Sequence, residues 1–195
     1  MHDFTDLITA YAWTRDADRR RDIGERIWRW FGVEGAVLVV DLCGFSRRAI
    51  GDAGILDFLA VIRRMQAAVR PIVWMHEGEI VKMEADNCFA FFPSADGAVK
   101  AALELVDASR TIRAAEHIPL EVCCGIESGR LLYLKEKDFF GGAVNLASRL
   151  GEDLAQCDEI LVGPTARAGL AADGWRFADL DRIDAPAGAG RLLAP

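Results

Sequence analysis

The chain has little histidine, little cysteine and no long apolar run, and each shortage excludes a class of protein. Its 195 residues include three histidines and five cysteines. His2, His76 and His117 lie far apart in the chain and no two cysteines form a CxxC pair, so we expect no zinc site. No apolar run approaches the ~18 residues that span a bilayer, so we expect no membrane insertion. The N-terminus also lacks the apolar stretch of a secretory signal.

Basic side chains are outnumbered by acidic ones, 23 to 30, which gives a formal net charge of −7. A nucleic-acid binder would need a basic face, so we expect no nucleic-acid partner. Hydrophobic residues make up 52% of the chain, enough for one core without disulfides. Because the cysteine count is odd and no export signal is present, we expect reduced thiols and a cytoplasmic protein.

Hydrophobic periodicity divides the chain into an N-terminal helical segment, residues 1–33, and a second region, residues 34–195. In the first, Ile23, Ile27 and Trp30 recur at helical spacing. We expect this helix to pack on the following domain or on a partner chain.

The second region alternates strand and helix patterns in the order β-α-β-β-α-β-β-α-β. We expect strands at 35–42, 79–84, 88–92, 120–126, 130–134 and 159–162, and helices from 55 to about 71, from 94, over 145–150 and from 164. The tail predicts a loop with one final strand. This mixture of hairpins and crossovers predicts an α+β fold of the ferredoxin-like kind, a mainly antiparallel sheet with helices on one face.

Two aspartates are expected at neighbouring strand ends. Asp41 ends the apolar strand, and Asp86 lies at the tip of the hairpin that would pair beside it. Carboxylates placed in this way can hold a pair of divalent ions, as enzymes of in-line phosphoryl chemistry do. Aspartate is also common at strand ends and in turns for local hydrogen bonding. Spacing alone favours that local explanation.

Three segments, taken together and in order, change this weighting. They read VLVVDLCGFS (37–46), EGEIVKMEADNCFAFFPSADGAVKAAL (77–103) and CCGIESGRLL to EILVGPTA (123–166), the last containing FGGAVNLASRL. Over roughly residues 36–170 the chain resembles the catalytic domain of class III nucleotide cyclases, the adenylate/guanylate cyclase family. The first segment alone is a weak signal, but FGGAVNLASRL is specific.

The resemblance implies active sites shared between the two chains of a head-to-tail homodimer. It implies that Asp41 and Asp86, with the carbonyl of Leu42, bind two Mg²⁺ or Mn²⁺ ions. From the other chain, Asn145 would orient the ribose and Arg149 would meet the charge that develops on the α-phosphate. An amide suits a neutral sugar and a guanidinium fork suits phosphoryl oxygens.

The remaining contacts to a nucleoside triphosphate are also implied by the resemblance. Backbone N–H groups of Cys43, Gly44 and Phe45 would meet the triphosphate. Lys82 and Asp138 match the family's base-reading pair, one donor and one acceptor. Such a pair can read adenine, cytosine or uracil, and the family's guanylate enzymes usually place an acid where Lys82 stands.

The sequence departs from the family pattern at three points. Glu84 occupies a normally apolar position, either as a further acceptor in the base pocket or, the safer interpretation, as a surface acid. The late lysine that grips the triphosphate is missing, with Asp184 near its place and Arg182 as the substitute candidate. With no sensor module attached, the chain also resembles the stand-alone pyrimidine cyclases of bacterial anti-phage signalling, which make cyclic CMP or cyclic UMP. The base therefore stays open between ATP and a pyrimidine nucleotide.

We therefore expect a metal-dependent enzyme that converts a nucleoside triphosphate to its 3′,5′-cyclic monophosphate and pyrophosphate. The alternative is a catalytically silent cyclase-like module that binds a nucleotide to regulate a partner, which the missing late lysine favours. A diguanylate cyclase, another two-metal enzyme, is disfavoured because its GGDEF-type signature is absent.

Overall fold

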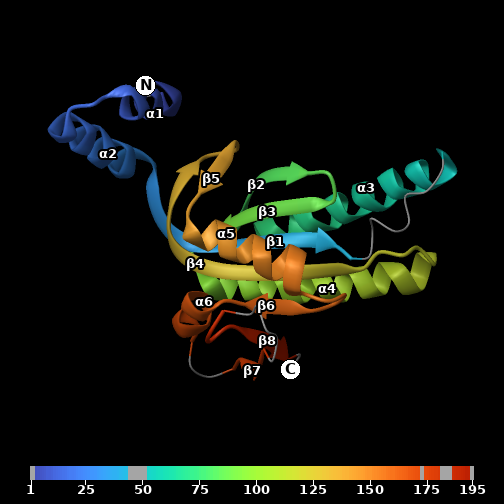
Figure 1. Cartoon of the computed structure of the whole chain (residues 1–195). Helices are drawn as coiled ribbons and strands as arrows, with labels where there is room; N and C mark the ends of the chain where they lie inside the picture. Colours follow the sequence, from blue (N-terminus) through green and yellow to red (C-terminus); the bar gives the residue numbers. More distant parts are fainter. Residues whose placement is uncertain (1–2, 44–51, 172–173, 181–185, 194–195) are drawn as a thin grey trace.

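The computed structural model describes residues 3–43, 52–171, 174–180 and 186–193, which form one sheet flanked by helices (Figure 1). The strands are β1 (Gly32–Leu42), β2 (Glu79–Glu84), β3 (Asn87–Phe92), β4 (Val122–Leu134), β5 (Asp138–Phe140), β6 (Ile160–Val162), β7 (Arg176–Asp179) and β8 (Gly190–Leu193). The helices are α1 (Phe4–Trp13), α2 (Ala17–Phe31), α3 (Asp52–Met75), α4 (Ala95–Glu116), α5 (Gly142–Ser148), the π-helix η2 (Arg149–Leu154) and α6 (Pro164–Gly169).

The strand order confirms the α+β, ferredoxin-like expectation. The sheet runs β2-β3-β1-β4-β6-β8-β7, with β5 paired to β4. Its first four strands pair antiparallel throughout, whereas β6 joins β4 in parallel. This is the arrangement that two interlocked β-α-β units produce.

The central strand β1 is apolar on both faces, which explains its continuous hydrophobic run. Leu38 and Val40 pack with α3 and α4, whereas Val37 and Val39 face the opposite side, where Ala147 of α5 packs. The expected placement of helices on one face therefore holds for the two long helices. The short α5 covers part of the other face (Figure 1), because its alanines allow close approach to the sheet.

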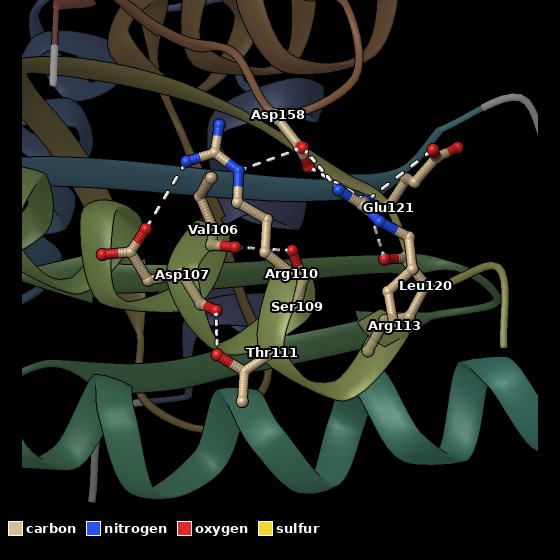
Figure 2. A network of polar contacts seen from close by, with 9 residues as sticks. All are labelled: Val106, Asp107, Ser109, Arg110, Thr111, Arg113, Leu120, Glu121 and Asp158. Carbon is tan, nitrogen blue, oxygen red and sulfur yellow. Dashed lines mark hydrogen bonds and ion pairs between the residues drawn. The ribbon is translucent and has the colours of Figure 1, made fainter. Parts of the chain in front are cut away.

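The C-terminal end of α4 is tied to the sheet by charged groups (Figure 2). Arg113 donates to Asp158 Oδ2 (2.8 Å) and to the carbonyl of Leu120 (3.2 Å), and Arg110 Nε donates to the same carboxylate oxygen (3.1 Å). Burial raises the pKa of Asp158, but the two guanidinium groups outweigh it and hold the pKa below its usual range. The network fixes α4 against the start of β4.

Several expected boundaries differ from the structure. The expected strands 120–126 and 130–134 form one strand, β4, because residues 127–129 pair with β1 instead of turning. Helix α3 continues past Pro71 to Met75, where Ile72 and Val73 still face the core. The hairpin turn lies at Ala85 and Asp86, so Asn87, which was expected to lie between the two strands, already belongs to β3.

The N-terminal segment forms two helices rather than one, and they project from one end of the sheet (Figure 1). Asp3 caps the N-terminus of α1 and Asp16 that of α2, each by accepting a hydrogen bond from a backbone N–H group. The break between the two helices therefore falls just before Asp16. Ile23 and Ile27 form a small core that contacts Leu132 of β4, which confirms packing on the following domain. Among the described residues, α3 and α4 are the longest helices, and neither they nor any other helix could span a bilayer.

Candidate active site

Asp41 and Asp86 lie at one end of the sheet, on neighbouring strands. Asp41 is the penultimate residue of β1, and Asp86 lies in the turn between β2 and β3. β1 pairs with β3 through Val40 and Cys88, so the next position along β1 brings Asp41 beside Asn87. The turn needs a left-handed residue, a conformation that favours glycine, and here Ala85 supplies it (φ 49°).

The two carboxylates repel each other across this turn. The pKa of Asp41 is raised from 3.8 to about 7, chiefly by burial and then by the charges of Asp86 and Glu152. The Leu42 backbone and the Cys123 thiol, whose Sγ lies 3.9 Å from Asp41 Oδ2, oppose that shift by hydrogen bonding. The site therefore holds more negative charge than its surroundings neutralise.

Glu152 of η2 is a further acid at this end of the sheet, one that the sequence analysis did not single out. Burial raises its pKa, a hydrogen bond from Ser148 opposes the shift, and the charge of Asp86 adds to it. The signal was available, because Glu152 follows Arg149 by three residues and shares its helix face.

The donor set fits a divalent cation such as Mg²⁺. Carboxylates and a backbone carbonyl are the hard oxygen ligands that Mg²⁺ prefers, usually with substrate phosphates and water completing the shell. The side-chain oxygen of Asn87, next to Asp86, is buried and has no hydrogen-bond partner in the structure. Within the described residues no three or more His, Cys, Asp or Glu side chains are arranged as a complete metal site. The substrate would therefore have to supply ligands.

Lys82 and Asp138, far apart in the sequence, meet in the structure. Lys82 Nζ lies 3.2 Å from Asp138 Oδ1 and 3.1 Å from Glu84 Oε1, and it stacks over the Phe89 ring at 4.9 Å from the centroid. Partial burial lowers the pKa of Lys82, but Glu84 and Asp138 more than compensate and raise it. The ammonium is therefore charged and held between two carboxylates.

Asn145 and Arg149 lie where α5 passes into η2, and both side chains are exposed. The N–H of Arg149 donates to the carbonyls of Asn145 and Leu146, so the helix continues through this point. Gly125 allows the end of α5 to lie close against β4, because a Cβ at this position would lie 2.1 Å from the carbonyl oxygen of Ala147.

The expected triphosphate contacts are described only in part. The N–H of Cys43, which was expected to contact the triphosphate, instead donates to the carbonyl of Glu121 (2.9 Å), the residue just before β4. Gly44, Phe45 and Arg182 lie outside the described residues.

Comparison with known proteins places these features in a family context. No protein-family model matches the chain. A putative adenylate cyclase of Rhizobium meliloti (strain 1021) is 30% identical over 119 residues, which cover 59% of this chain and 20% of that protein. The chain thus spans between 20% and 28% of the length of the curated relatives it matches.

Solved structures match over most of the chain. The catalytic core of a rhodopsin-guanylyl cyclase with converted specificity, in complex with ATPαS, superposes with a TM-score of 0.69 at 18% identity, covering 84% of this chain and 98% of that one. The adenylyl cyclase CyaB from P. aeruginosa gives a TM-score of 0.69 at 19% identity, covering 84% and 95%. The chain therefore has the fold of the class III adenylate/guanylate cyclase catalytic domain.

Proposed function

We propose that the protein is a class III nucleotide cyclase, which converts a nucleoside triphosphate to its 3′,5′-cyclic monophosphate and pyrophosphate. The observation that carries the proposal is the pairing of Lys82 with Asp138 at 3.2 Å, a donor and an acceptor able to read one base edge. The fold of the matched cyclases and the carboxylates at the end of β1 support it.

In this proposal each group has a defined task. Asp41, Asp86 and the Leu42 carbonyl hold two divalent ions, Mg²⁺ or Mn²⁺. When bound, the ions neutralise the triphosphate and acidify the ribose 3′-hydroxyl. The 3′-oxygen bonds to the α-phosphorus as the bond to the pyrophosphate oxygen breaks, and the hydroxyl proton passes to water. Asn145 orients the ribose, and Arg149 stabilises the charge on the α-phosphate.

The working form in this proposal is a homodimer in which Asn145 and Arg149 act on the nucleotide held by the partner's metal-binding aspartates. The base is one that presents a donor next to an acceptor, which includes adenine, cytosine and uracil. A pyrimidine product would suit a second messenger of anti-phage defence, and an adenine product would suit the putative adenylate cyclase among its relatives. Four buried free thiols suit a reducing, cytoplasmic location.

One experiment tests this function directly. The purified protein is incubated with ATP, GTP, CTP or UTP and Mn²⁺, and the products are identified by chromatography and mass spectrometry. We expect one 3′,5′-cyclic monophosphate with an equal amount of pyrophosphate. Nucleotide binding without either product would instead support a silent regulatory module.

A further inference from the structure

Glu84 is a surface acid, as expected, with 62% of its side chain exposed, and it also contacts Lys82 of the base-reading pair. It lies two residues after Lys82 on β2, so both side chains leave the strand on the same side. Its carboxylate lies 3.1 Å from Lys82 Nζ, as close as that of Asp138. The structure therefore contains a group of three, with one ammonium between two carboxylates.

The number of N–H groups on the Lys82 ammonium limits how many hydrogen bonds it can donate to a base. An ammonium has three N–H donors. Glu84 and Asp138 each take one, and the Phe89 ring covers part of the ammonium surface. One N–H remains for a base. Asp138 Oδ1 also accepts from the N–H of Phe139 (2.9 Å), which leaves its second oxygen to accept from a base amine.

Base edges differ in what stands beyond the ring nitrogen that Lys82 would donate to. Adenine presents its amine, then the acceptor N1, then a C–H group. Cytosine presents its amine, then the acceptor N3, then the O2 carbonyl. Uracil and guanine present an N–H at the ring position, which would face the ammonium. A carboxylate placed at the third position repels a carbonyl oxygen but tolerates a C–H group.

We propose that Glu84 is a specificity-determining residue, which holds Lys82 toward the ring nitrogen and rejects the O2 carbonyl of cytosine. The inference rests on the proposed cyclase function and deepens it. With Lys82 held at the ring position by Glu84, the pair reads an amino base, adenine or cytosine, rather than uracil, and the Glu84 carboxylate then selects adenine. The substrate of this site is ATP.

Glu84→Gln tests the inference, because it keeps the side-chain length and replaces an acceptor oxygen by an amide donor that can face O2. Initial rates with each of the four nucleotides give the ratio of kcat/KM for CTP to that for ATP. We expect the ratio to rise by about tenfold or more, as one repulsive contact becomes an attractive one. Glu79→Gln is the matched control, since Glu79 lies on the same strand but binds Tyr133 and Lys135. It should leave the ratio unchanged.

A binding measurement separates failure of this inference from failure of the proposed function. Calorimetry with the α,β-methylene analogues of ATP and CTP, which cannot release pyrophosphate, reports base preference without turnover. We expect the wild type to bind the ATP analogue more tightly than the CTP analogue. Glu84→Gln should reduce the ratio of the two dissociation constants by the same factor as that expected for the ratio of kcat/KM. A ratio that Glu84→Gln leaves unchanged, or a wild type that prefers CTP or UTP, would overturn the role of Glu84 even if a cyclic product forms. If no product forms but the binding preference follows Glu84, only the cyclase function fails.

Discussion

At the scale of single residues, the protonation of Asp41 links the site to pH. Its pKa is about 7 because burial and two neighbouring acids disfavour the charged form. An unfolded aspartate has a pKa of about 3.9. Between these values the folded chain binds a proton that the unfolded chain has lost, so without metal its stability falls as pH rises through this window.

Asp41→Asn should remove this pH dependence. Because the amide carries no charge, the metal-free variant should gain in melting temperature relative to wild type as pH rises from 5 to 8. Thermal denaturation in EDTA at several pH values measures the difference. Asp158→Asn is a control of opposite sign, since its lowered pKa gives stability that is present above pH ~4 and lost in acid. A difference between Asp41→Asn and wild type that is equal at pH 5 and pH 8 would contradict the assignment.

Mn²⁺ should stabilise the wild type and not Asp41→Asn. A cation that binds only the folded state raises the melting temperature by mass action, and it binds the carboxylate only after the proton leaves. The rise in melting temperature should therefore be larger at pH 8 than at pH 6.

In activity assays, Asp41→Ala and Asp86→Ala should each lose turnover while keeping the circular dichroism spectrum of the wild type. Substantial turnover by a well-folded Asp41→Ala protein would refute the metal-binding role.

At the scale of elements, local pattern predicted most of the sheet and failed where tertiary contacts decide. The β1 run and the α4 start at Ser94 follow from composition and capping alone. The segment Glu127-Ser128-Gly129 has turn composition yet continues β4. It pairs with β1, and the buried Glu127 carboxylate accepts a hydrogen bond from the N–H of Ala166. No local signal reports such a distant partner.

Glu127 should be among the costliest side chains to remove. It is 2% exposed and accepts hydrogen bonds from the N–H groups of Ser128 (2.6 Å), Ala166 (2.7 Å) and Thr165 (3.5 Å). It thereby caps the start of α6 from within the sheet. Glu127→Ala leaves buried donors unsatisfied, at about 1–3 kcal/mol each, so we expect a loss of roughly 3 kcal/mol or more in urea unfolding.

Glu127→Gln gives the graded comparison for this prediction. Its single side-chain oxygen can still accept, so we expect a loss smaller than that of Glu127→Ala. Gly163→Ala should also destabilise, because a Cβ there would lie 2.3 Å from Glu127 Oε2. An Ala variant as stable as wild type would show that this carboxylate does not hold α6.

At the scale of the whole molecule, the sequence predicted which residues belong to the site better than how they interact. The Lys82–Asp138 pair was expected and lies at 3.2 Å. Glu152 was not singled out, and the contact from Glu84 matches only the less favoured of its two interpretations, since it depends on how β2 presents that side chain. The assembly of a complete site from two chains stays a prediction, and it follows from dimensions. Lys82 and Asp86 are four residues apart on one hairpin, which spans at most ~13 Å even if extended.

A triphosphate with metals at one end and a base at the other does not fit between two residues of one short hairpin. We therefore expect Asp86 to serve one site and Lys82 the other, across a two-fold axis. Asp41→Ala and Arg149→Ala should each be nearly inactive alone. Mixed in equal amounts and allowed to exchange chains, they should regain activity, because a mixed dimer has one site with both lesions and one with neither.

The expected recovery is about a quarter of the wild-type rate, since random pairing makes about half of the dimers mixed and each has one intact site of two. Asp41→Ala mixed with Asp86→Ala is the matched control. Both lesions lie in the metal-binding half of a site, so each site of the mixed dimer keeps one of them and no recovery should occur. Chain exchange is verified separately with differently tagged subunits. If exchange occurs and the Asp41→Ala and Arg149→Ala mixture stays inactive, the two residues act within one chain and the shared-site dimer is wrong.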